Sequence, residues 1–122
     1  MKFDRTKRIG EQMRRDLSQA LPMLLSHPRA SMLSVTAVVV TRDLSFAKVY
    51  VTHILNDEAE RQMLVKMLNQ QAPQFRHYLA KRLDIRKMPE LSFVYDHSVE
   101  YGAKMEQKLS ALVKDLPDEE EM

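Results

Sequence analysis

The sequence of 122 residues contains no cysteine and no tryptophan, and its only glycines are Gly10 and Gly102. A chain without cysteine has no disulfide, no thiol nucleophile and no cysteine-based zinc site. Two isolated glycines exclude a glycine-rich phosphate-binding loop and the nucleotide-binding enzymes that use one. No apolar run approaches the ~20 residues of a membrane-spanning helix, and no apolar segment follows the positive start as in a secretory signal. We therefore expect a cytoplasmic protein.

The residues that usually carry catalysis or bind metals are poorly placed for either role. The histidines lie far apart and have no metal-ligand spacing: His27, His53, His77 and His97. Asp96, His97 and Ser98 are consecutive, so their side chains point apart instead of forming a triad, and no nucleophile elbow is present. We predict no catalytic residue, no metal site and no cofactor.

Charge is unevenly distributed along the chain. Residues 115–122 hold five acidic residues and no basic one, so residues 1–114 hold 19 basic and 12 acidic residues, a formal charge of +7. The length suits a single domain. We predict one domain over residues 1–114 and an acidic, disordered tail over 115–122. The basic domain favours a polyanionic partner, and the plain alternative is a solvated surface of mixed charge.

The first half of the chain predicts a helix followed by a hairpin. Apolar residues recur at spacings of three and four over residues 4–26, which is typical of an amphipathic helix, and Pro22 is expected to end or kink it near Leu21. Residues 33–41 and 46–55 are rich in valine and threonine and predict two antiparallel strands. The polar residues 42–45 predict the turn between them.

The second half predicts a kinked helix, a strand and a last helix. Asp57 and Glu60 have the spacing of a capping box, and the expected buried face of the helix that follows is Met63, Leu64, Met67 and Leu68. Pro73 interrupts this helix and starts a third one over residues 73–84. Residues 91–96 predict a third strand, and Ser98 is placed to cap a C-terminal helix. Three strands with helices on one face make an α+β layer fold.

Three segments resemble one known family, namely FDRTKRIGEQMRRDLSQAL, SVTAVVVTRDLSFAKVYVTHI and PELSFVYDHSVEYGAKM. They are similar to bacterial ribosome-binding factor A, and the resemblance covers residues 3–113. It implies a KH-like fold of the type II order, helix-strand-strand-helix-kink-helix-strand. It also implies a factor that binds the immature small (30S) ribosomal subunit, assists late maturation and 5′-end processing of 16S rRNA, and is linked to growth in the cold. A monomer is implied as well.

The resemblance places the family's helix kink at Ala72, Pro73 and Gln74. The family usually has a glycine where this chain has Gln74, so a side chain occupies the position of closest approach to phosphate. Pro73 has no N–H to donate. We expect side-chain cations to carry more of the RNA contact, with backbone N–H groups near Gln74 and Phe75 as a further contact.

Two cationic clusters are the predicted RNA-binding surfaces. The first lies on the first helix, and the alternative for it is a solvated face balanced by nearby acids: Arg5, Lys7, Arg8, Arg14 and Arg15. The second follows the kink, where KH-like folds bind nucleic acid, and includes one tyrosine as a candidate for base stacking: Arg76, His77, Tyr78, Lys81, Arg82, Arg86 and Lys87. Arginine and lysine contacts to phosphate give affinity with little base specificity.

The predicted function is therefore non-enzymatic RNA binding within the small ribosomal subunit, with no DNA or membrane partner. Two alternatives remain open. One is a protein-interaction module that adds a partner strand at the edge of the hairpin. The other is a small hydrolase similar to acylphosphatase, against which the scarcity of glycine argues.

Overall fold

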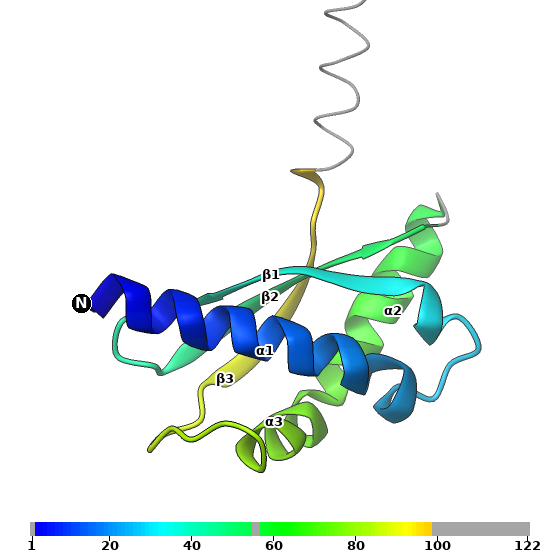
Figure 1. Ribbon diagram of the computed structural model, residues 1–122. Helices are drawn as coiled ribbons and strands as arrows, with labels where there is room; N and C mark the ends of the chain where they lie inside the picture. Colours follow the sequence, from blue (N-terminus) through cyan, green and yellow to red (C-terminus); the bar gives the residue numbers. More distant parts are fainter. Residues whose placement is uncertain (1, 55–56, 99–122) are drawn as a thin grey trace, which may run out of the picture.

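The computed structural model describes residues 2–54 and 57–98, with side chains from residue 5 onward (Figure 1). The elements follow in the order α1 (Lys2–Leu24), a 3₁₀ turn η1 (Ala30–Met32), β1 (Leu33–Val40), β2 (Phe46–His53), α2 (Glu58–Gln70), α3 (Ala72–Ala80) and β3 (Glu90–Tyr95). This order confirms the predicted α+β fold. The predicted C-terminal helix and the acidic tail lie outside the described residues.

The sheet has the strand order β1-β2-β3, with β2 in the centre. β1 and β2 form the predicted antiparallel hairpin, with a register shift between Val35 and Ala37. β3 lies parallel to β2, with Phe46 opposite Glu90 and Val51 opposite Tyr95. Parallel strands need a long crossover connection, since no tight turn can join them. Here α2, α3 and the loop after α3 make that crossover.

The core lies between one face of the sheet and the helices. α1 packs against β1 and α3, and both α2 and α3 pack against β3. Met13, Leu17 and Leu21 form the apolar stripe of α1 and are fully buried, as the helical spacing predicts. Phe75 of α3 meets Phe93 of β3 in a tilted pair with ring centroids 5.3 Å apart. This aromatic contact stabilises the packing of the crossover against β3.

Several predicted boundaries need correction. α1 continues through Pro22 to Leu24, since a proline near the end of a helix removes only one late hydrogen bond. α3 begins at Ala72 instead of Pro73 and ends at Ala80 instead of residue 84. Met63 is 43% exposed and lies outside the core, whereas Leu64 and Leu68 are buried as predicted.

Gly10 marks the closest approach between α1 and β1. A Cβ atom at this position would lie 2.6 Å from the carbonyl oxygen of Val38, a distance that real side chains do not tolerate. The backbone of α1 therefore rests directly on the backbone of β1. Glycine is needed at residue 10 because of this contact, even though it weakens a helix interior.

The outer edge of β3 is held by the side chain of Asn69, near the end of α2. The Asn69 amide nitrogen donates to the carbonyl oxygen of Phe93 over 2.9 Å, and the N–H of Phe93 donates to the Asn69 carbonyl oxygen over 2.7 Å. The amide side chain thus replaces a neighbouring strand at this residue. It satisfies two backbone groups beside the core that would otherwise lack partners.

We expect replacement of Asn69 by alanine to lower the free energy of unfolding by about 1–3 kcal/mol, because it leaves both backbone groups of Phe93 without their partner. Urea unfolding followed by circular dichroism measures the change. Gln70→Ala, at the adjacent exposed position, is the matched control and should stay within about 0.5 kcal/mol of wild type. Equal stability of the two variants would refute a role for the Asn69 pair.

Candidate nucleic-acid interface

The predicted kink residues form the first turn of α3, and the break itself lies one residue earlier. Gln71, with φ −98° and ψ 8°, separates α2 from α3. Pro73 fits within the first turn because its missing N–H has no intrahelical partner there. The N–H groups of Gln74 and Phe75 both donate to the carbonyl oxygen of Gln71. The proposed presentation of these two donors to phosphate is therefore not favoured.

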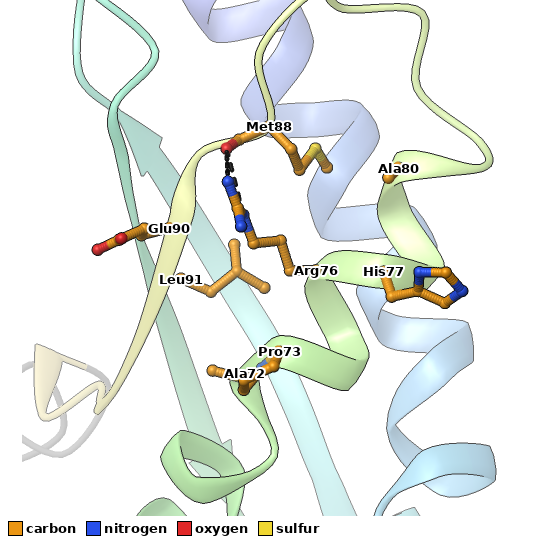
Figure 2. Close-up of a pocket in the computed structure, with 8 residues that line it drawn as sticks. All are labelled: Ala72, Pro73, Arg76, His77, Ala80, Met88, Glu90 and Leu91. Carbon is orange, nitrogen blue, oxygen red and sulfur yellow. Dashed lines mark hydrogen bonds between the residues drawn. The ribbon is translucent and has the colours of Figure 1, made fainter.

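Arg76 is turned toward its own chain. Its Nη2 donates to the carbonyl oxygen of Met88 over 2.8 Å, and its Nε donates to that of Pro89 over 3.2 Å. Figure 2 shows the side chain reaching from α3 to the loop that precedes β3. The sequence predicts Arg76 as an RNA contact, and the geometry shows that this exposed side chain also makes a contact within the protein. The guanidinium group fixes the end of the loop that carries Arg86 and Lys87.

A hollow of about 590 Å³ lies beside this contact (Figure 2). Its lining combines the start of α3, the loop and the start of β3: Ala72, Pro73, Arg76, His77, Ala80, Met88, Glu90 and Leu91. The His77 ring points away from Arg76. The hollow therefore brings Ala72 and Pro73 of the predicted kink together with Arg76 and His77 of the second cluster.

Tyr78 is poorly suited to stacking on a base. Its ring packs half-buried against the core, and its hydroxyl group is buried without a hydrogen-bond partner among the described residues. The Arg82 guanidinium lies 4.3 Å from the centre of the ring, a cation–π contact on one face. The structure assigns Tyr78 to packing. Arg82 in turn is held against α3.

Arg76 and Arg82 are exposed in spite of these contacts, and so are the remaining cations of the second cluster. Lys81 follows the last residue of α3, and Arg86 and Lys87 lie in the loop before β3; all three are exposed. Lys87 Nζ reaches Ser45 Oγ in the β1–β2 turn over 3.4 Å. The loop therefore lies against the hairpin, as the hydrogen bond from the Glu90 N–H to the Ser45 carbonyl oxygen also shows.

The first cluster is exposed along α1 with one exception. Arg5, Lys7, Arg8 and Arg15 are exposed, whereas Arg14 is half-buried. Arg14 Nε donates to a Glu11 carboxylate oxygen over 2.9 Å. This hydrogen bond lowers the pKa of Glu11 and raises that of Arg14. Arg14 is thus partly neutralised within α1, as the solvated-face alternative expects.

The β1–β2 turn adds a cation that the sequence does not single out. Arg42 is exposed and lines a hollow of about 330 Å³ together with Arg5, Thr6, Asp43 and Leu44. Arg5 of the first cluster and Lys87 of the second therefore flank the same turn. A lone arginine between two strands has no periodicity, so no sequence pattern would have selected it. Only the folded chain brings the three cations together.

The turn is closed by a network around Asp43. Thr41 Oγ1 donates to Asp43 Oδ1 over 2.8 Å, and the Ser45 N–H donates to the same oxygen over 3.1 Å. Leu44 has φ 59°, in the left-handed region that few residues other than glycine adopt. These side-chain hydrogen bonds hold the turn in this conformation.

The same network lowers the pKa of Asp43 from 3.8 to about 2, chiefly through the Ser45 side chain, then the Thr41 hydroxyl and the Ser45 backbone, with Lys87 contributing less. A carboxyl group whose pKa is depressed on folding stabilises the fold above its unfolded pKa, and this contribution disappears as the pH falls through the folded pKa. The Asp43 contribution is therefore present above about pH 4 and is lost toward pH 2.

We expect Asp43→Asn to lose less stability than wild type when the pH is lowered from 4 to 2. Urea unfolding midpoints at half-unit pH steps measure this difference. Some acid sensitivity should remain in the variant, because hydrogen bonds from Ser98 and Thr36 also lower the pKa of Asp96. Parallel profiles for the two proteins would contradict a stabilising role of the ionised turn carboxylate.

For Arg76, we expect Arg76→Ala to lower the free energy of unfolding by about 1 kcal/mol, since the carbonyl groups of Met88 and Pro89 lose a charged donor. Faster amide hydrogen exchange at residues 86–88 and at Glu90 should accompany the loss. His77→Ala, an exposed neighbour on α3, serves as the control and should change neither quantity. Unchanged exchange in Arg76→Ala would show that the loop holds its shape without the guanidinium group.

Within residues 2–54 and 57–98, the side chains contain no group of three or more histidine and acidic residues that could hold a metal ion. No helix in this part of the chain is long and apolar enough to cross a membrane. The architecture, an α-β-β-α-α-β order with a break between the last two helices and a three-stranded sheet, defines a KH-like domain of the type II order.

The family model for ribosome-binding factor A matches residues 5–109. The chain is 70% identical over 112 residues to ribosome-binding factor A from Dichelobacter nodosus, covering 92% of each protein. It is 41% identical to the one from Shewanella sediminis, covering 93% of this chain and 79% of the relative. The chain therefore belongs to the ribosome-binding factor A family, which confirms the resemblance in the sequence.

Solved structures of this family share the fold. The crystal structure of ribosome-binding factor A from Thermus thermophilus matches with a TM-score of 0.63 at 27% identity, covering 74% of this chain and 94% of the other. A homology model of the Thermus thermophilus protein has also been fitted into a cryo-electron-microscopy map of a complex with the 30S subunit. It matches with a TM-score of 0.60 at 27% identity, over 72% and 91% of the two chains.

Proposed function

We propose that this ribosome-binding factor binds the immature small ribosomal subunit through 16S rRNA and assists its late maturation, including processing at the 5′ end. It acts in the cytoplasm as a monomer, without catalysing a reaction, and its contribution is greatest in the cold. Membership of the family and the 30S complex of a relative support this proposal.

The observation that carries the proposal is the exposed cationic surface after α3. Lys81, Arg86 and Lys87 follow one another around the end of α3 and the loop, and all are exposed. Contact with RNA phosphates releases condensed counterions, which gives affinity without a need for base contacts. Specificity for one particle then comes from the spatial arrangement of the phosphates in folded rRNA.

The contacts of the cationic side chains decide which of them are the clearest targets for a test. Arg76 and Arg82 belong to the predicted surface, but one holds the loop and the other covers Tyr78. Reversing the charge of either would disturb packing together with RNA contact. Lys81 and Arg86 are better targets, since neither side chain makes a hydrogen bond or ring contact with another of the described residues.

We expect the double variant Lys81→Glu, Arg86→Glu to lose most of its binding to small subunits while its thermal unfolding stays close to that of wild type. Co-sedimentation with purified small subunits over a salt series measures the affinity. Loss of two phosphate contacts should reduce the slope of log affinity against log salt by about 1.5. Wild-type binding by this variant would remove the surface after α3 from the interface.

The matched control is Lys66→Glu, a charge reversal at an exposed position of α2. It lies beside Tyr95 and His97, at the opposite end of β3 from the loop. The control should bind as wild type does. Failure of wild type itself to bind small subunits at low salt would overturn the proposed function.

A further inference from the structure

Three segments that are distant in the sequence meet at one end of the sheet. The start of α1, the turn between β1 and β2, and the loop before β3 all lie at the same end of the molecule in Figure 1. Arg5 and Arg42 line one hollow there, and Lys87 contacts Ser45 of the same turn. We call these three residues, Arg5, Arg42 and Lys87, the end cluster.

The end cluster is built on a rigid base. The Thr41 N–H donates to the Phe46 carbonyl oxygen, and the Leu44 N–H donates to the Thr41 carbonyl oxygen, each over 2.9 Å. The loop is attached to the turn by the Glu90 N–H and is held from the other side by Arg76. Cations on a preorganised base lose less conformational freedom on binding than cations on a mobile loop.

Charge in the end cluster favours an anionic ligand. Arg5 and Arg42 line the hollow together with one carboxylate, that of Asp43, and Lys87 contacts the same turn. Asp43 Oδ1 already accepts two hydrogen bonds from within the turn. The net formal charge of these four groups is +2. An arginine guanidinium can donate two parallel hydrogen bonds to one phosphate, and lysine adds a compact charge. The hollow of about 330 Å³ has the size for such a group.

We propose that Arg5, Arg42 and Lys87 form a binding site for the backbone phosphates of one RNA strand. This inference rests on the proposed function for the identity of the ligand as RNA. The site joins the cations of α1 to those after α3, so the two surfaces form one continuous track around the end of the sheet. Arg42 is the residue at the centre of this track.

The test uses the full-length chain with Arg42→Gln, Lys87→Gln and the double variant, each checked for folding by thermal unfolding. Two ligands are titrated over a salt series: purified small subunits, and a 20-base-pair RNA duplex of arbitrary sequence. Each lost phosphate contact should reduce the slope of log affinity against log salt by roughly 0.7 to 0.9. We expect a reduction of about 1.5 for the double variant.

Two further variants separate a specific site from general charge. Arg42→Lys keeps the positive charge but loses the guanidinium group that can donate two parallel hydrogen bonds to one phosphate. It should therefore keep the wild-type slope but bind more weakly. Lys66→Gln removes one exposed charge at the far end of β3 and should leave the slope unchanged. A double variant with the same slope as wild type overturns the site.

The two ligands separate failure of the site from failure of the proposed function. If wild type binds small subunits and Arg42→Gln leaves the salt dependence of that binding unchanged, the function stands and the site is wrong. If only the duplex is bound, and binding depends on Arg42, the site stands and the proposed function fails. Absence of binding to both ligands at low salt overturns both.

Discussion

The parallel alignment of β3 beside β2 is the constraint on which the rest of the molecule depends. It forces the chain to cross from one end of the sheet to the other, and α2 and α3 form inside that crossover. The Phe75–Phe93 contact and the Asn69 pair then hold the crossover on the strand. Because the crossover returns next to the β1–β2 turn, it also brings Lys87 to that turn.

Local patterns in the sequence predict most of the elements because those elements depend on neighbouring residues. The valine-rich strands, the stripe of α1 and the Asp57 cap, whose side chain accepts from the Glu60 N–H, all have short-range causes. Only half of the expected capping box forms, since the Glu60 carboxylate pairs with Arg29. Arg29 is far away in the sequence, so no local pattern could have predicted this competition.

The candidate site is less predictable than the fold for the same reason. A cationic side chain looks the same in the sequence whether it meets solvent, a carbonyl group or an aromatic ring. Arg76 and Arg82 are used within the protein, whereas Arg42 gains importance only from neighbours at residues 5 and 87. Composition identifies a basic domain, and tertiary contacts decide which of its charges make contacts within the protein.

The contact between Gly10 and the Val38 carbonyl group has a consequence beyond packing. At this point the backbone of α1 lies closest to that of β1. Arg5 lies five residues away, about 7.5 Å along the helix axis. A side chain at residue 10 would force α1 and β1 to shift at this contact, and a shift of α1 would change the position of Arg5 relative to Arg42. The absence of a side chain at Gly10 thus helps to set the distance between Arg5 and Arg42, although Gly10 contacts neither residue.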